Sequence, residues 1–220
     1  MIESVLFDLD GTLLNTTDGV LESAIYAAKT LGYHELPREI MRSFVGPPIQ
    51  QSFMKWYGCT IEEAQHAANL FRNYYKDNAL FKAELYPGVI EMLENLKNIR
   101  MKIGVATYKR EDYAISILEH FGISQFCDTM HGADNMNVLT KADIINTCIS
   151  DMSSKNDNVV LVGDTEHDAK GTIESAIKFI GVTYGFGFVS EKDVNYYPNI
   201  GCAGNTNDII NIIKSYRYEN

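Results

Sequence analysis

Two groups of acidic residues each follow an apolar run, and they are the residues of the sequence best suited to do chemistry. Asp8 and Asp10 follow the run at 5–7, and Asp164 and Asp168 follow a second run that ends at a glycine. Such runs predict buried strands, and in open α/β sheets functional sites lie beyond the carboxyl ends of the strands. Because Asp and Gly after a strand also build simple turns, a purely structural turn is the alternative for Asp8-x-Asp10-Gly11 taken alone.

The four carboxylates would meet at one edge of a sheet if the two strands are neighbours. Their mutual repulsion makes sense when a divalent cation is bound between them, and a site made only of oxygen ligands favours Mg²⁺ over zinc. For Glu166 and Asp168 the alternative is a helix N-terminus carrying acidic residues, which the helix dipole favours. The sequence therefore predicts a Mg²⁺ site built from acids of both motifs.

Two further residues between these motifs are suited to bind an oxyanion. Thr107 directly follows the apolar run at 102–106, and Lys141 stands at the start of an expected helix. A hydroxyl at a strand end and an ammonium at a helix N-terminus can both hold phosphoryl oxygens, and backbone amides of the turn at 8–10 could hold more. Taken singly, Thr107 also fits a helix N-cap and Lys141 a solvated surface residue.

Strands and helices alternate from residue 86 onward, which predicts an α/β fold with a mainly parallel sheet flanked by helices on both faces. The expected helices span 89–98, 110–121, 141–151, 167–176 and 208–216, and the expected strands span 103–106, 127–130, 159–162 and 179–182. The segment Tyr184-Gly185-Phe186-Gly187-Phe188 is rich in glycine but lacks the spacing of a dinucleotide-binding loop, so we assign it no function.

Residues 15–82 differ from this alternation because their pattern is helical throughout. Apolar residues recur at helical spacing up to Gly32, Pro37 opens a short second helix, and Gly46-Pro47-Pro48 separates it from a third. Thr60 and Glu63 match a capping box that starts a fourth helix. We therefore expect an α/β core domain at 1–14 and 83–220, and a helical domain at 15–82 inserted after the first strand.

Composition and charge exclude several classes of protein. The 220 residues carry a formal net charge of −10 with scattered Lys and Arg, which argues against a nucleic-acid-binding surface. The four cysteines show neither CxxC spacing nor clustering with His, so neither a zinc site nor a redox pair is predicted. Because acids break the N-terminal apolar run and no stretch approaches ~18 apolar residues, we expect no secretory signal, no membrane span and a cytoplasmic location.

The chain resembles a known family in the order of its motifs. It is similar to the haloacid dehalogenase-like (HAD) hydrolase superfamily, and within it to the phosphoglycolate phosphatase-like branch, through Asp8-x-Asp10-Gly11-Thr12-Leu13, Thr107, Lys141 and Gly163-Asp164-x-x-x-Asp168. The first and last motifs are specific, whereas Thr107 and Lys141 are weak alone. The resemblance spans nearly the whole chain, because the helical insertion matches the cap domain of that branch, and it implies a Rossmann-like core with a helical-bundle cap.

The resemblance also implies a role for each motif residue. In this chain the nucleophile would be Asp8, the general acid/base Asp10, the phosphate ligands Thr107 and Lys141, the Mg²⁺ ligands Asp8, Asp10 and Asp164, and the residue that orients the metal shell or Lys141 would be Asp168. An aspartate nucleophile divides hydrolysis into formation and breakdown of an aspartyl phosphate, while the metal neutralises charge. Asp10 must be able to hold a proton for the leaving alkoxide, and a crowd of carboxylates raises one pKa.

The chain departs from the family pattern at two positions. Many members have Ser or Asn after the Thr and Pro after the Lys, whereas this chain has Tyr108 and Ala142. Neither change removes a reacting group, but Tyr108 is bulky enough to narrow the phosphate pocket or to touch the leaving group. Haloacid dehalogenases themselves lack an acid at the position of Asp10, so Asp10 favours phosphate over carbon–halogen chemistry.

Substrate specificity is expected to come mainly from the helical insertion. We place residues 44–49 over the active site. This stretch contains a Gly-Pro-Pro turn, for which a rigid connection between helices is the alternative. The candidate specificity residues are Phe44, Gly46, Pro47, Tyr108 and Lys109, and Arg42 and His131 are further possible contacts for which a solvated surface role is favoured.

Together these features predict a Mg²⁺-dependent phosphate monoester hydrolase. Its substrate would be a small phosphorylated metabolite, such as 2-phosphoglycolate, a nucleoside monophosphate or a sugar phosphate. One alternative is a phosphosugar mutase of the β-phosphoglucomutase type, which would use the aspartyl phosphate to rephosphorylate its intermediate. The other is a non-catalytic phosphoester-binding protein, against which the intact set of Asp8, Asp10, Lys141 and Asp164 weighs. The sequence leaves the oligomeric state open.

Overall fold

The computed structural model of the chain describes residues 1–136 and 138–219. The chain divides into two compact units, which we call the α/β unit (Met1–Asn15 and Leu85–Asn220) and the helical unit (Thr16–Glu84). Two short strands, β2 (Leu14–Asn15) and β3 (Glu84–Leu85), pair with each other in the segments where the chain passes from one unit to the other. No helix among the described residues is both long and apolar enough to cross a membrane.

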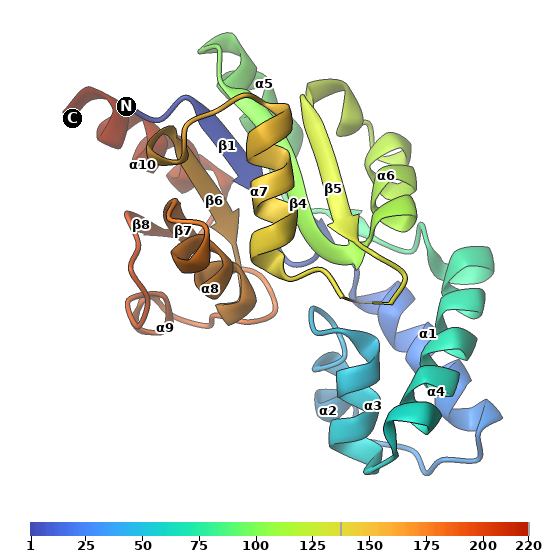
Figure 1. The fold of residues 1–220 in the computed structure, drawn as a ribbon. Coiled ribbons are helices and arrows are strands. Elements are labelled where there is room, and N and C mark those ends of the chain that lie inside the picture. Colours follow the sequence, from blue (N-terminus) through green and yellow to red (C-terminus); the bar gives the residue numbers. More distant parts are fainter. Residues whose placement is uncertain (137, 220) are drawn as a thin grey trace. The chain divides into compact units, whose positions relative to one another are not determined.

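A six-stranded sheet forms the centre of the α/β unit, in the order β5-β4-β1-β6-β7-β8 (Figure 1). Its strands are β1 (Ser4–Phe7), β4 (Lys102–Arg110), β5 (Thr129–Ala133), β6 (Val159–Gly163), β7 (Lys178–Val182) and β8 (Gly201–Ala203). Each neighbouring pair in this order is parallel. The prediction of a mainly parallel α/β sheet is therefore confirmed.

The central strands form where the sequence is continuously apolar. All four residues of β1 and all five of β6 are buried, as expected for parallel strands that are covered on both faces. Phe7 at the end of β1 is in register with Val105 of β4 on one side and with Val162 of β6 on the other. The residues that follow these three strands consequently emerge at the same edge of the sheet.

Helices cover both faces of this sheet. They are α5 (Val89–Asn98), α6 (Glu111–His120), α7 (Lys141–Asp151), α8 (Glu166–Glu174), α9 (Glu191–Val194) and α10 (Thr206–Glu219). The helix α7 packs against α8, and α5 packs against α10, so that the sheet lies between the two pairs (Figure 1). Because α7 and α8 begin at the carboxyl edge of the strands, their N-termini lie beside the residues that follow β1 and β6.

The structure corrects several predicted boundaries in the α/β unit. The strand β4 continues to Arg110 and has an irregular register with β5 after Ala106, so the helix expected from residue 110 begins at Glu111. The strand β5 starts at Thr129, two residues later than expected. The strand β8 and the helix α9 were not predicted, because both are too short to show a periodic pattern. These differences place Thr107, Tyr108 and Lys109 inside a strand.

The helical unit consists of α1 (Thr17–Thr30), α2 (Arg38–Arg42), α3 (Ile49–Tyr57) and α4 (Ile61–Tyr74), followed by a π-helical turn at Tyr75–Ala79. The capping box at the start of α4 is confirmed. The Glu63 amide donates to Thr60 Oγ1 at 3.2 Å, and the Thr60 amide donates to Glu63 Oε2 at 2.8 Å. This reciprocal pair satisfies two amides that the helix itself leaves without a partner.

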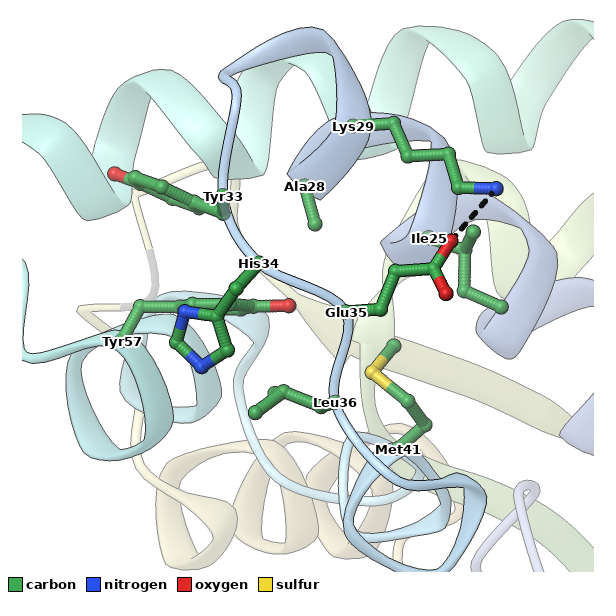
Figure 2. Close-up of a pocket in the computed structure, with 9 residues that line it drawn as sticks. All are labelled: Ile25, Ala28, Lys29, Tyr33, His34, Glu35, Leu36, Met41 and Tyr57. Atoms are coloured by element: carbon green, nitrogen blue, oxygen red, sulfur yellow. Dashed lines mark ion pairs between the residues drawn. The ribbon is translucent and has the colours of Figure 1, made fainter.

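An aromatic cluster fills part of the interior of the helical unit. Phe44 and Phe53 are buried and meet edge to face, with ring centroids 5.4 Å apart, and Tyr57 stacks on Tyr33 at 4.7 Å. Beside this cluster lies a small cavity of about 150 Å³ (Figure 2). Its lining residues are Ile25, Ala28, Lys29, Tyr33, His34, Glu35, Leu36, Met41 and Tyr57.

Candidate active site

Three carboxylates meet at the carboxyl edge of the sheet. Asp8 follows β1, Asp164 follows β6, and Asp168 lies in the first turn of α8. One oxygen from each lies within 4.8 Å of the others, and all three side chains are buried. Since β1 and β6 are adjacent, the sequence expectation that acids of the two motifs lie close together is fulfilled for these three residues.

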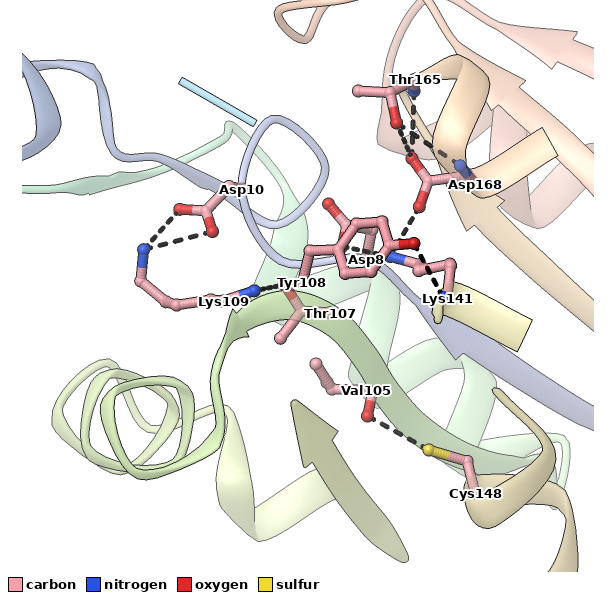
Figure 3. A network of polar contacts seen from close by, with 10 residues as sticks. All are labelled: Asp8, Asp10, Val105, Thr107, Tyr108, Lys109, Lys141, Cys148, Thr165 and Asp168. Carbon is pink, nitrogen blue, oxygen red and sulfur yellow. Dashed lines mark hydrogen bonds and ion pairs between the residues drawn. The ribbon is translucent and has the colours of Figure 1, made fainter. Parts of the chain in front are cut away.

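Lys141 connects two of the three acids. Its ammonium donates to Asp8 Oδ1 at 2.6 Å and lies 2.6 Å from Asp168 Oδ1 (Figure 3). Lys141 is the first residue of α7, and the preceding Thr140 caps that helix. The stem of the lysine passes closely over Gly171 of α8, where a Cβ atom would lie 2.7 Å from Lys141 Cγ. The expected position of Lys141 at a helix start is correct, and its side chain is buried rather than solvated.

The burial of this cluster changes its acid–base properties. Burial raises the pKa of Asp8 to about 7, with the nearby Lys141 opposing the rise and Asp168 adding to it. The pKa of Asp164 is also raised well above its usual value, by burial and then by the charges of Asp168 and Asp8. Burial alone would lower the pKa of Lys141, but Asp168 and Asp8 raise it instead, so the lysine stays charged. Lys141 is therefore the charged partner of Asp8 and Asp168.

The loop after β7 holds the Asp164 carboxylate in place. The amides of Phe186 and Gly187 donate to Asp164 Oδ2 at 2.6 and 3.2 Å. Gly185 makes this approach possible, because a Cβ atom there would lie 2.3 Å from the carbonyl oxygen of Gly11 and 2.4 Å from Asp164 Oδ2. The sequence interpretation noted only that this segment is rich in glycine and lacks dinucleotide-loop spacing, and it missed these contacts with Asp164. The available signal was a pair of glycines shortly after a buried strand.

The donor set fits a hard divalent cation. Asp164 Oδ1 is buried and has no hydrogen-bond partner among the residues that the structure describes, while its other oxygen is held by two amides. A buried acceptor in this state is unfavourable unless a cation or another donor satisfies it. Three carboxylates within 4.8 Å supply oxygen ligands only, which suits Mg²⁺.

Asp168 has a second structural function besides its contact with Lys141. Its Oδ2 accepts hydrogen bonds from the amide and the hydroxyl of Thr165, at 3.0 and 2.7 Å, and so forms the capping box of α8. The two interpretations offered for this residue from the sequence thus hold together: it stabilises a helix N-terminus with one oxygen and contacts Lys141 with the other.

Asp10 is not one of the three acids whose oxygens lie within 4.8 Å of one another, but its charge is close enough to Asp8 to help raise the pKa of that residue. Both of its oxygens accept hydrogen bonds from Lys109 Nζ, at 2.9 and 3.2 Å, and both side chains are largely buried (Figure 3). A metal contact of Asp10 stays a prediction. Thr107 is also buried, and its hydroxyl accepts the Lys109 amide at 3.1 Å. Lys109 of β4 therefore contacts Thr107 through its backbone and Asp10 through its side chain.

Tyr108 contacts the backbone of Lys141. Its hydroxyl accepts a hydrogen bond from the Lys141 amide at 2.9 Å, and its ring meets His167 edge to face at 5.5 Å. Burial lowers the pKa of His167, so this ring favours its neutral form. A contact between Tyr108 and a leaving group stays a prediction.

His131, a possible substrate contact in the sequence, is held by two acids. Its Nδ1 lies 3.1 Å from Glu111 Oε2, and its Nε2 lies 2.7 Å from Asp151 Oδ2. Burial alone would lower the pKa of His131, but these hydrogen bonds raise it above its usual value. The histidine therefore links β5 to α6 and α7.

The candidate specificity residues Phe44, Gly46 and Pro47 belong to the helical unit. Phe44 packs inside that unit against Phe53, which makes its side chain part of the local interior. Arg42 is exposed at the end of α2. The contribution of this stretch to substrate specificity stays a prediction.

Comparisons with known proteins found similar proteins that match most of this chain. The family model described as haloacid dehalogenase-like hydrolase matches residues 5–182. A 5'-nucleotidase of Pseudomonas aeruginosa is 31% identical over 202 residues, which cover 91% of this chain and 90% of the relative. The pyrophosphatase PpaX of Halalkalibacterium halodurans is 28% identical, with coverages of 89% and 91%. The crystal structure of a predicted phosphatase from Clostridium acetobutylicum superposes with a TM-score of 0.85 at 32% identity, covering 92% of this chain and 95% of that one.

Proposed function

Because this chain belongs to the haloacid dehalogenase-like hydrolase family, we propose that it is a Mg²⁺-dependent phosphomonoesterase that works through a phosphorylated aspartate. The chain is a phosphatase of the HAD-like type, because the family model describes a haloacid dehalogenase-like hydrolase and similar proteins are named 5'-nucleotidase, pyrophosphatase and predicted phosphatase. The metal, the roles of the individual residues and the class of substrate belong to the proposal.

One observation carries the proposal. Asp8, Asp164 and Asp168 converge within 4.8 Å, and a single buried lysine, Lys141, contacts two of them. A purely structural cluster would balance its charges, whereas this one holds three carboxylates against one ammonium. An excess of buried negative charge with an unsatisfied oxygen on Asp164 is what a cation-dependent site requires.

Asp8 and Asp164 are the residues that would hold Mg²⁺. Asp168 contacts Lys141 and Thr165, so its role would be to position Lys141 rather than to bind the metal. When bound, the cation would supply positive charge that favours the ionised forms of Asp8 and Asp164 and attracts the phosphoryl group. Since the pKa of Asp8 is raised to about 7 without a cation, this carboxylate is only partly ionised at neutral pH in the metal-free protein.

The proposed reaction assigns one step to each polar group of the site. An oxygen of Asp8 attacks phosphorus, the ester bond to the leaving oxygen breaks, and an aspartyl phosphate forms. Lys141 and the Thr107 hydroxyl hold phosphoryl oxygens. Protonated Asp10 gives its proton to the leaving alkoxide and then, as a base, takes a proton from the water that cleaves the aspartyl phosphate. Asp10 has to leave its contact with Lys109 to do so.

We propose small phosphorylated metabolites as substrates. The relatives named 5'-nucleotidase and pyrophosphatase favour nucleoside 5'-monophosphates and pyrophosphate for a first panel, to which 2-phosphoglycolate and sugar phosphates are added. The helical unit would serve as a cap, with the turn at Gly46 and Pro47 contributing to the choice of substrate. The outcome of the panel decides among these compounds.

The proposal is tested with p-nitrophenyl phosphate as a generic substrate. Asp8→Asn should abolish turnover, because an amide oxygen is a far weaker nucleophile than a carboxylate. Asp157→Asn is the matched control, because Asp157 is an exposed acid outside the carboxylate cluster, and it should keep wild-type activity. EDTA should remove activity and Mg²⁺ should restore it.

Two results would contradict the proposal. Retained turnover in the Asp8 variant would exclude this residue as the nucleophile, and hydrolysis that persists in EDTA would exclude the metal site. Production of a sugar-phosphate isomer without release of inorganic phosphate would instead identify a mutase.

A further inference from the structure

We propose that Tyr108 is a positioning residue that fixes the backbone of Lys141, so that the lysine ammonium is held on the phosphoryl group. This inference rests on the proposed function, because it assigns Tyr108 to the same site. It does not require Tyr108 to touch the substrate.

The hydroxyl of Tyr108 satisfies an amide that α7 cannot satisfy itself. The first amides of a helix have no carbonyl partner within the helix. At the start of α7, the Thr140 hydroxyl accepts the amide of Asp143, and the Tyr108 hydroxyl accepts the amide of Lys141 at 2.9 Å. The residue whose backbone is fixed in this way is the one whose side chain lies between Asp8 and Asp168.

The ring of Tyr108 is itself held on several sides. It meets His167 of α8 edge to face, with an interplanar angle of 82°. It also packs against the buried core beneath α7, which includes Ala106 and Ile144. The Lys141 ammonium lies 5.7 Å from the ring centroid, within the range of a weak cation–π contact. Tyr108 extends from β4, and its hydroxyl contacts the backbone at the start of α7 (Figure 3).

Three kinds of contact together determine where the ammonium lies. Tyr108 fixes the backbone of Lys141, Gly171 leaves room only for the lysine stem, and Asp8 and Asp168 hold the nitrogen. Lysine has a flexible four-carbon stem, so a shift of its backbone carries over to its charge. Displacement of a catalytic group by about 1 Å can cost about 100-fold in rate. Loss of one of three contacts should cost less, about tenfold.

The test compares Tyr108→Phe with the wild-type enzyme in the presence of Mg²⁺. With p-nitrophenyl phosphate, kcat should fall about tenfold while KM changes less than about twofold, because the ammonium is needed most in the transition state. Orthovanadate, which mimics the pentacoordinate phosphorus of the transition state, should bind about tenfold more weakly. Tyr197→Phe removes a hydroxyl that contacts Glu166 in the same unit, and as the matched control it should stay within about twofold of wild type.

A double-mutant cycle separates positioning from a general structural effect. Orthovanadate affinity is measured by calorimetry in Lys141→Met with and without the Tyr108→Phe change. If Tyr108 acts through Lys141, its substitution should change the affinity less than about twofold in this background. In the wild-type protein the Lys141 amide should also be protected from hydrogen exchange, and this protection should be lost in Tyr108→Phe.

Specific results would overturn the inference. Unchanged kcat and vanadate affinity in Tyr108→Phe would refute it, and so would an equal weakening of vanadate binding with and without Lys141. Rapid exchange of the Lys141 amide in the wild-type protein would refute it as well. Failure of the proposed function has a different signature, namely turnover that survives Asp8→Asn.

Discussion

The Asp164→Asn substitution should have opposite effects on stability with and without Mg²⁺. In the metal-free protein it should stabilise the fold, because Asp164 is one of three buried carboxylates that lie within 4.8 Å of one another. The amide oxygen of Asn can still accept the hydrogen bonds from Phe186 and Gly187. Its NH₂ group would replace the unsatisfied Oδ1 and face the carboxylates of the cluster.

The size of the metal-free effect follows from the charges. Two unit charges 4.8 Å apart repel by roughly 3.5 kcal/mol at an effective dielectric constant of about 20. The raised pKa values of Asp8 and Asp164 mean that the carboxylates share protons at neutral pH, which removes part of this repulsion. We therefore expect a stabilisation of about 1–3 kcal/mol, or an increase in Tm of roughly 2–10 °C for a chain of this size.

The effect should depend on pH with a defined sign. An acid whose pKa is raised by folding destabilises the fold above its unfolded pKa, near 3.9, and the penalty grows as the pH rises through the folded value. Since the pKa of Asp164 is raised, the advantage of the Asn variant should be largest in mildly alkaline solution and should vanish at about pH 4.

Magnesium should make the wild-type protein more stable than Asp164→Asn, the reverse of the metal-free order. At about 100 times its Kd, a ligand that binds only the folded state stabilises it by about 2.7 kcal/mol. The wild-type Tm should therefore rise by about 5–10 °C, whereas Asp164→Asn should respond by about 1 °C or less. Thermal and urea unfolding in EDTA and in Mg²⁺ measure both quantities. Destabilisation of the metal-free protein by the substitution, or an equal Mg²⁺ response of both proteins, would refute the reasoning.

Three other substitutions test separate contacts. Lys109→Met removes the ammonium that contacts both oxygens of Asp10 and should lower kcat for p-nitrophenyl phosphate more than it raises KM; an unchanged kcat would show that the pair does not orient Asp10. Because the pKa of His131 is raised, its ion pairs contribute fully below about pH 6.5 and are lost as the pH rises through the folded pKa. His131→Asn should thus lower the urea midpoint at about pH 5.5 but hardly at about pH 9, and a uniform loss would contradict this. Gly171→Ala gains about 1 kcal/mol of helix propensity but places a Cβ 2.7 Å from Lys141 Cγ, so activity should fall without loss of Tm.

The local features of this protein were readable from its sequence. The buried strands before Asp8 and Asp164 follow from apolar runs, the start of α4 from the Thr60 capping box, and the position of Lys141 from the helix that it opens. Each depends on interactions between residues a few positions apart, which composition and spacing encode directly. The parallel order of strands followed from the regular alternation of strand and helix.

The partners of the charged side chains were decided only by the tertiary structure. Lys141 lies 133 positions from Asp8, and Lys109 lies 99 positions from Asp10, so no local pattern could show that one lysine contacts the carboxylate cluster while the other contacts Asp10.

The same limit applies to the groups that support the site. The loop at 184–187 holds Asp164 because β7 lies beside β6, which brings the amides of the loop to that carboxylate. Tyr108 meets Lys141 because an irregular β4 extends to the start of α7. Sequence spacing determines which chemical groups are present at strand ends and helix starts, but pairing between distant segments decides which of them share a charge or a hydrogen bond.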